Sequence, residues 1–173
     1  MFDYEAEGTK FKLCCYYNLP NAEEISTYLK DNQPPLVLID ARMVVSIRQI
    51  KTAVYNALIL EKSGKMQSKS VYLEIMRCLS PDGRLSSTLK YVTINVETKD
   101  VIALTLNDTF PDVPGLSDPQ PYNEEIAQTK IDYVVLRNIY RVTDEMLKFY
   151  TFEQIAINTN TIAVSDLVHV KTV

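Results

Sequence analysis

The chain has 173 residues, of which 46% are hydrophobic, so it is long enough for one domain with its own core. Its formal net charge of −4 argues against a protein that binds long polyanions over its whole surface, because such binding needs many clustered cations. No apolar run approaches the ~20 residues of a transmembrane helix, and the acidic start lacks the pattern of a signal peptide. These features favour an intracellular protein without membrane contact.

The first part of the chain predicts a strand, a helix and a second strand, after a loose N-terminal segment at residues 1–10. Residues 11–17 are rich in aromatic and cysteine side chains, which is typical of a strand. Asn21 can cap a helix that runs to about Lys30. Residues 36–39 then form a compact apolar run of strand length.

Residues 46–62 carry the clearest helical pattern. Ser46 and Gln49 match a capping box, and Gly64 supplies a C-terminal stop. Apolar side chains recur between them at helical spacing, at Ile47, Ile50, Val54, Ala57 and Leu58. Lys62 lies at the negative end of the helix dipole, so helix stability by itself is one explanation of this cation.

The middle of the chain predicts further alternation of strands and helices. Residues 71–79 are apolar on both sides, which favours a buried strand, although a helix capped by Ser70 is the alternative. A turn at 80–83 precedes a short helical pattern at 85–92 and a strand at 101–106. We therefore expect an α/β or α+β fold: a single domain over the whole chain, with a mixed sheet of about four to five strands packed against several helices.

Residues 107–125 predict an exposed acidic connector. This segment holds half of the 8 prolines and no lysine or arginine, a composition that cannot bury much apolar surface. We expect an ordered edge or a mobile loop here rather than a domain boundary.

The last third of the chain predicts a helix that begins after Asp132. Asp132 can cap this helix, which runs to Tyr140 and buries Val135, Leu136 and Ile139.

Thr151 can cap a final helix over residues 152–166. Its asparagines and β-branched residues are poor helix formers, so packing must hold it in place. One stripe carries Phe152, Ile155, Ala156, Thr159, Ile162 and Ala163. The stripe is either core or in part a docking face, and both interpretations stay open. The candidate partner-binding residues are Phe152, Gln154, Ile155, Thr159 and Ile162.

No group of residues predicts catalysis, and we expect no cofactor and no metal. The single histidine, His169, is expected in a terminal tail. The three cysteines lack the spacing of a zinc site and are expected to be reduced thiols in a core. Asp40 and Glu74 could form a carboxylate pair, but a turn residue and a solvated acid at a strand end are the simpler interpretation.

Cations gather in the middle of this acidic chain. Between positions 62 and 90 the sequence has two acids, Glu74 and Asp82, against Lys62, Lys65, Lys69, Arg77, Arg84 and Lys90. A local basic face of this size suits a few phosphates of single-stranded or terminal RNA rather than a long duplex. Ordinary solvated lysines are the alternative.

Several runs also resemble a known family. The runs are LIDARMVVSIRQIKTAVYNAL, GKMQSKSVYLEIMRCLSP, LSSTLKYVTI and LRNIYRVTDEML. In this order they are similar to the kinase-binding accessory subunit of the KEOPS complex, also called EKC, over roughly residues 11–167. The most specific pieces are residues 40–46, the Gly-Lys-Met at 64–66 followed by Lys69, and the Leu-Ser-Pro at 79–81.

The resemblance implies a non-catalytic subunit, nuclear and cytoplasmic, with two direct partners. One is the small atypical kinase/ATPase of KEOPS, through which the other subunits are reached. The second is tRNA, held at its single-stranded C-C-A end while the complex makes threonylcarbamoyladenosine beside the anticodon. Lys65 and Lys69 would meet phosphates and Met66 would meet bases. The candidate RNA-binding residues are thus Lys62, Lys65, Met66, Lys69 and Arg84.

Two other functions are kept as alternatives. The chain could be a scaffold that regulates the kinase without touching RNA, or a small hydrolase or transferase that uses Cys78 or a carboxylate.

Overall fold

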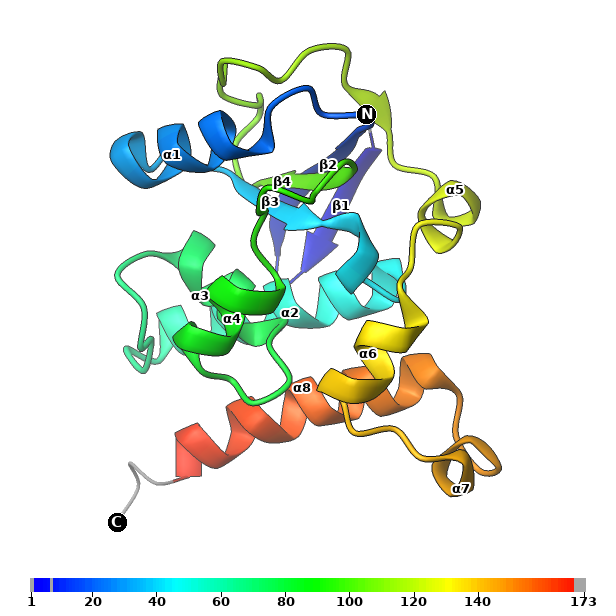
Figure 1. The fold of residues 1–173 in the computed structure, drawn as a ribbon. Helices are drawn as coiled ribbons and strands as arrows, with labels where there is room; N and C mark the ends of the chain where they lie inside the picture. The colour runs from blue at the N-terminus through cyan, green and yellow to red at the C-terminus, as the bar shows by residue number, and fades with distance from the viewer. Residues whose placement is uncertain (1, 7, 170–173) are drawn as a thin grey trace.

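An open sheet of five strands forms the centre of the structure (Figure 1). The computed structural model describes residues 2–6 and 8–169. The strands are β1 (Phe2–Ala6), β2 (Thr9–Tyr16), β3 (Val37–Asp40), β4 (Val101–Thr105) and β5 (Gln120–Pro121). Their order is β1-β2-β4-β3, with β5 beside β2, and every pairing among these strands is antiparallel.

The α+β class and the number of strands are confirmed. The sheet has no parallel pair among the described strands, whereas a mixed sheet was predicted. The reason is the position of β4, which lies between β2 and β3 and runs opposite to both. The two strands of the predicted β-helix-β unit therefore point the same way without being neighbours.

Each strand of the sheet centre sends alternate side chains to opposite faces. Cys15 on β2 and Ile39 on β3 face one core, and Cys14 and Leu38 beside them face the other. The three cysteines are free and buried, as predicted. Both faces of the sheet are covered, which explains why every residue of β4 is buried and why four of its five residues, Val101 to Leu104, are apolar.

Helices cover these two faces unequally. The helices are α1 (Ala22–Asn32), α2 (Ile47–Lys62), α3 (Val71–Cys78), α4 (Leu85–Tyr91), α5 (Glu124–Gln128), α6 (Tyr133–Ile139), α7 (Asp144–Leu147) and α8 (Phe152–His169), with a short 3-10 helix at Ala41–Met43. Helices α2 and α3 pack on one face of the sheet, and α1 lies on the other. Helix α2 lies between the sheet and α8 (Figure 1).

Local capping signals predicted several of these helices correctly. The Asn21, Ser46 and Asp132 side chains each accept the backbone N–H three residues later, at the starts of α1, α2 and α6. Thr151 does the same for α8 and is paired reciprocally with Gln154, which accepts the N–H of Thr151.

Residues 71–78 form a helix, so the favoured prediction of a strand was wrong. The Ser70 hydroxyl accepts the N–H of Leu73 and caps α3. The helix is short and contacts α2, α4, α8 and β3, which buries its sides. A helix that is covered on several sides loses the one-sided apolar period by which helices are recognised in a sequence.

The N-terminal segment is also more ordered than predicted. Residues 2–6 form β1, an edge strand in which Glu5 lies opposite Lys10 and the ring of Tyr4 stacks on Phe11. Opposite charges that face each other across a strand pair stabilise the pair. The acidic composition of this segment did not reveal that pairing. Positions 1 and 7 of the predicted loose segment lie outside the described residues.

The acidic connector is ordered as well. Val113 is buried against the sheet, together with Phe110 and Leu116, and β5 joins the edge of β2. Its apolar side chains therefore close the second core, although most of the connector is exposed.

The burial of the last helices differs from the prediction at individual positions. Leu136 on α6 is buried, but Val135 is exposed and Ile139 only partly covered. Helix α8 extends to His169, which was expected in a tail; the surroundings of its side chain lie outside the described residues.

Candidate functional site

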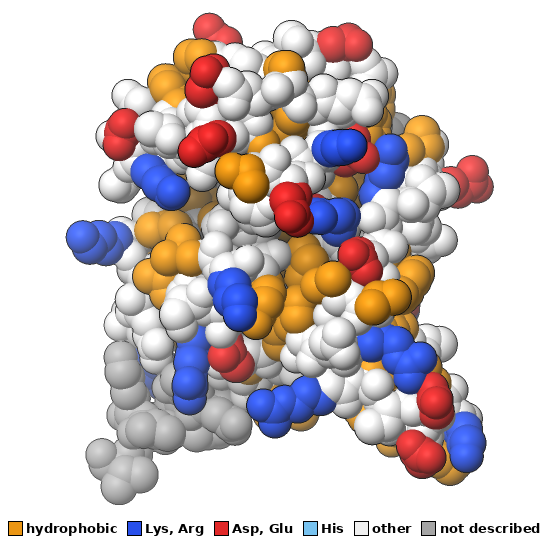
Figure 2. Space-filling model, viewed as in Figure 1, with side chains coloured by type: hydrophobic (Ala, Val, Ile, Leu, Met, Phe, Trp, Pro, Cys, Tyr) orange, Lys and Arg blue, Asp and Glu red, His pale blue; other side chains and the backbone are white. Residues whose placement is uncertain are grey.

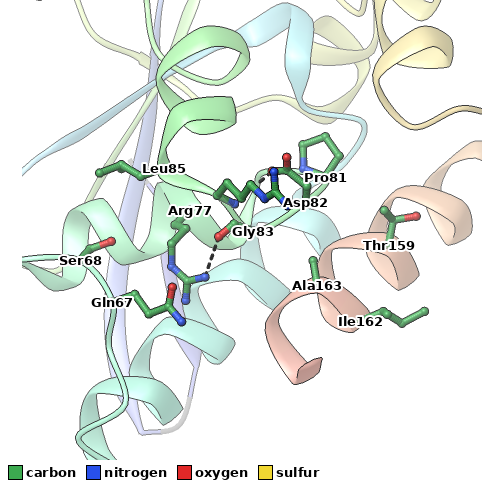
Figure 3. Close-up of a pocket in the computed structure, with 11 residues that line it drawn as sticks. Gln67, Ser68, Arg77, Pro81, Asp82, Gly83, Leu85, Thr159, Ile162 and Ala163 are labelled. Carbon is green, nitrogen blue, oxygen red and sulfur yellow. Dashed lines mark hydrogen bonds between the residues drawn. The ribbon is translucent and has the colours of Figure 1, made fainter. Parts of the chain in front are cut away.

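A hollow of about 660 Å³ lies between α3, the turn at residues 80–84 and α8 (Figure 3). We call it the α3–α8 pocket. Gln67 and Ser68 border it from the loop at residues 63–70, which we call the basic loop, and Arg84 borders it from the turn. Thr159, Ile162 and Ala163 of α8 form its far wall. The pocket therefore brings one predicted RNA-binding residue, Arg84, next to two predicted partner-binding residues, Thr159 and Ile162.

A buried ion pair adjoins the pocket, and its arginine, Arg77, is one of the lining residues. The side chain of Arg77 is 2% exposed and that of Glu74 is 0% exposed, one helical turn apart on α3. The Arg77 guanidinium donates to Glu74 Oε1 through Nε at 3.2 Å and through Nη2, and its Nη1 donates to the carbonyl of Gly83 at 2.8 Å. Arg77 thereby ties α3 to the turn at residues 80–84.

Glu74 ties α3 to the basic loop. Its Oε1 accepts the backbone N–H of Gln67 at 3.4 Å, and its Oε2 accepts that of Ser68 at 2.9 Å. Burial by itself would raise the pKa of Glu74, but hydrogen bonds from Arg77 and Ser68 hold this pKa below its ordinary value. The carboxylate is therefore charged inside the protein.

The turn at residues 80–84 approaches α8 closely. Gly83 has a φ of +64°, and a Cβ at this position would lie 3.2 Å from the carbonyl oxygen of Ala163. Asp82 stiffens the turn, since its carboxylate accepts from the hydroxyls of Ser80 and Ser87 and from the N–H of Arg84.

Asn160 fastens α8 behind the same turn. Its Nδ2 donates to the carbonyl of Ser80 at 2.9 Å, and its Oδ1 accepts from Nε2 of Gln49 at 3.0 Å. Gln49 also donates to the hydroxyl of Tyr140. A buried polar network thus links α8 to α2, α6 and the pocket turn, and such a network specifies one arrangement of the elements.

The candidate RNA-binding residues lie around the pocket but not all in it. Arg84 lines it and is exposed, whereas Lys62, Lys65 and Lys69 lie outside its lining. Within the described residues no carboxylate lies within 4.0 Å of the Lys65 or Lys69 ammonium group. Met66 is half-buried and packs against the core on the face of the sheet that α2 and α3 cover.

Two charged residues do not have the predicted environment. Arg77 belongs to the buried ion pair and not to an exposed basic face, and Glu74 is buried rather than solvated. Lys90 lies over the ring of Tyr91, 4.7 Å from its centroid. On the face drawn in Figure 2, several acidic side chains lie at the top, and most Lys and Arg side chains lie lower, with further acidic side chains among them.

The predicted partner-binding stripe is divided between core and surface. Ile155 is 5% exposed and Phe152 contacts the rings of Tyr133 and Tyr140, so both belong to the core at the α6–α8 contact. Ile162 is 60% exposed, and Thr159 is half-buried at the pocket. Gln154 is exposed, but its side chain caps α8.

The comparisons with known proteins now decide the family. Residues 16–166 match the family described as kinase binding protein CGI-121. The chain belongs to the CGI-121 family. The matched residues run from the end of β2 into α8, so they include the α3–α8 pocket and its ion pair.

Named relatives support the same assignment. A Candida glabrata protein named EKC/KEOPS complex subunit CGI121 is 29% identical over 161 residues, which cover 89% of this chain and 88% of the relative. A Danio rerio protein named EKC/KEOPS complex subunit TPRKB is 27% identical over 135 residues, 75% of this chain and 77% of that one. An Eremothecium gossypii protein, again named EKC/KEOPS complex subunit CGI121, is 28% identical and covers 72% of this chain and 69% of the relative.

The cysteine and carboxylates that were considered for catalysis have structural environments in this CGI-121 chain. Burial raises the pKa of the Cys78 thiol to about 12, so it is protonated at neutral pH and a poor nucleophile. Asp40 is paired with Arg42 and accepts from Thr98, whereas Glu74 is paired with Arg77. Among the described residues no group of three potential ligands could hold a metal ion, and no helix is long and apolar enough to cross a membrane.

Sequence reasoning missed the residues that shape the pocket. Gly83 was recognised only as part of a turn, and its approach to α8 depends on a helix eighty residues away. Nothing in the sequence distinguished Gln67 and Asn160 from the polar residues beside them. The spacing of Glu74 and Arg77, i and i+3, would have indicated an ion pair had residues 71–79 been assigned to a helix.

Proposed function

We propose that this chain is a non-catalytic accessory subunit of a KEOPS/EKC complex, nuclear and cytoplasmic, that binds the atypical kinase/ATPase of the complex and the C-C-A end of tRNA. It thereby supports threonylcarbamoyladenosine formation on tRNA. The match to the CGI-121 family, together with relatives named as subunits of this complex, carries the proposal.

The kinase contact is assigned to the exposed side of α8. Ile162 presents a large apolar side chain to solvent beside Thr159, and a partner can cover this surface without disturbing the core residue Ile155. Ile162→Arg places a charge in that contact and should weaken kinase binding more than tenfold without lowering the melting temperature of the free chain. Unchanged kinase affinity, measured by calorimetry, would place the contact elsewhere. Gln154→Arg is less suitable because it also removes a helix cap.

The RNA contact is assigned to the basic loop and the α3–α8 pocket. Lys65, Lys69 and Arg84 supply cations for phosphates around a hollow with apolar walls, including Leu85 and Ala163, and a polar side chain, Gln67. Single-stranded RNA is bound by this combination of cations and surfaces for unstacked bases.

The decisive experiment compares intact tRNA with tRNA trimmed of its terminal C-C-A. Binding should be tighter for the intact tRNA, measured by electrophoretic mobility and by fluorescence anisotropy at several salt concentrations. Lys65→Glu with Lys69→Glu should weaken binding well over tenfold and reduce the salt slope by roughly two phosphate contacts, with the melting temperature near wild type. Equal binding of both tRNAs would favour a kinase-regulating scaffold without RNA contact.

A hydrolase or transferase is disfavoured by the burial of Cys78. Enzymatic activity of the isolated chain would distinguish this alternative. In the proposed accessory role, product forms only when the kinase and the carbamoyl-transferring enzyme are present.

A further inference from the structure

The basic loop owes its shape to a buried acid. Helix α2 is closed by the N–H groups of Gly64 and Lys65, which donate to carbonyls of the last helical turn, and α3 begins with its cap at Ser70. Between these points the backbone N–H groups of Gln67 and Ser68 both donate to the carboxylate of Glu74. The acid thus holds the centre of the segment that carries Lys65 and Lys69.

The same acid is connected to the opposite side of the pocket. Arg77 bridges Glu74 to the carbonyl of Gly83, and Gly83 touches α8 at Ala163. Figure 3 shows Arg77 between Gln67 of the loop and Gly83 of the turn. One buried ion pair therefore sets the distance between the basic loop and the turn that bears Arg84.

We propose that Glu74, supported by Arg77, is a positioning residue for RNA: it touches no RNA, but it holds the basic loop and the Arg84 turn in the arrangement in which their cations meet one RNA end together. This inference rests on the proposed RNA contact. The role is unexpected for Glu74, because a negative charge by itself would weaken the binding of a polyanion such as RNA.

Stability by itself is a weak explanation of the pair. Burying two charges costs desolvation, and replacing a buried ion pair with apolar residues of similar size is often neutral or stabilising. Apolar residues would not, however, accept the N–H groups of Gln67 and Ser68. Removing both charges therefore separates the loop-holding role from the stabilising role.

Two double variants provide the test, and they differ only in whether an acceptor remains. Glu74→Leu with Arg77→Met has no acceptor for the loop. Glu74→Gln with Arg77→Met is equally uncharged but keeps an amide oxygen that can accept one of the two N–H groups. The conservative Ile50→Val change in the α2 core controls for a general loss of stability.

The probe is labelled intact tRNA, with C-C-A-trimmed tRNA beside it, and the full chain is used throughout. The Leu/Met variant should bind intact tRNA about tenfold more weakly, as expected when one residue of backbone has to be ordered on binding. The Gln/Met variant should recover part of this loss, and Ile50→Val should bind as wild type does. The salt slope should stay unchanged in both double variants, because every phosphate-binding cation is retained.

Amide hydrogen exchange gives a second readout, which separates a local loosening of the basic loop from a general loss of stability. In the Leu/Met variant the amides of Gln67 and Ser68 should lose protection while those of α2 keep it. If the Leu/Met variant binds tRNA with wild-type affinity, or if both amides stay protected, the positioning role is overturned and the RNA proposal stands. If wild-type protein does not distinguish intact from trimmed tRNA, the RNA proposal falls and this inference falls with it.

Discussion

At the scale of single residues, backbone geometry at two glycines shows how the pocket depends on tertiary contact. Gly64 and Gly83 have almost the same φ, +65° and +64°. A Cβ at Gly64 would meet open space, whereas a Cβ at Gly83 would press on the backbone of α8. The two positions therefore separate the cost of a left-handed backbone from the cost of a steric conflict.

Replacing each glycine with alanine measures this difference. Gly64→Ala should destabilise the chain by about 1 kcal/mol, the usual cost of a left-handed conformation for a residue with a Cβ. Gly83→Ala should cost about 2 kcal/mol or more, because α8 must also shift. Denaturant unfolding of both variants checks the prediction; equal losses would show that the turn does not press on α8 in solution.

Asp82 makes the pocket turn sensitive to acid. Burial by itself would raise its pKa, but hydrogen bonds from Ser87, Arg84 and Ser80 lower it below the ordinary value of 3.8. A lowered folded-state pKa contributes stability that is present above the unfolded pKa and is lost as the pH falls through the folded pKa. Asp82→Asn should therefore weaken the fall in stability below about pH 3.8, measured by urea unfolding at a series of pH values. The same acid dependence in wild type and variant would contradict this account.

At the scale of elements, α8 has a buried part and an exposed part that its sequence pattern does not separate. Ile155 packs in the core with α6, while Ile162, two turns later, is exposed beside the pocket. The hydrogen-bond network around Asn160, and not helix propensity, sets which face of α8 is buried.

Truncating the two isoleucines distinguishes these two parts. Ile155→Ala should lower the free energy of unfolding by about 2–5 kcal/mol, because it leaves a cavity in a packed cluster. Ile162→Ala should change stability by no more than about 0.5 kcal/mol and should reduce kinase affinity. Similar stability losses at both positions would mean that Ile162 is covered in the free protein.

At the scale of the whole molecule, the proposed kinase face and the proposed RNA pocket share one helix. Thr159 and Ile162, which are assigned to the kinase contact, also line the α3–α8 pocket, and Asn160 between them is bonded to the pocket turn. Because the two proposed sites meet at these residues, a ligand bound at one site should change the affinity for the other ligand.

The two binding events should therefore be linked. The factor by which the kinase changes the dissociation constant for tRNA should equal the factor by which tRNA changes that for the kinase, and fivefold or more is an ordinary size for such coupling. Titrations of each ligand with and without the other, on the assembled proteins, measure both factors. Independent affinities would show that α8 does not transmit the contact.

The sequence by itself determined the elements whose signals are local. Caps at Asn21, Ser46, Asp132 and Thr151 act on the next three residues, and the apolar period of α2 reflects one buried face, so these helices were predicted correctly. The motifs at residues 40–46, 64–66 and 79–81 were also sufficient for the family resemblance, because sequence motifs are compared residue by residue and require no structure.

Only the tertiary structure decided the rest, because it depends on which distant residues meet. Residues 71–78 are a helix since neighbours on several sides bury it, and β1 forms because β2 offers it a partner. Arg77 was counted among exposed cations until the fold placed Glu74 and Gly83 around it. The turn at Gly83 lies close to Ala163 because glycine has no Cβ, and this contact joins the middle of the chain to a helix from its far end.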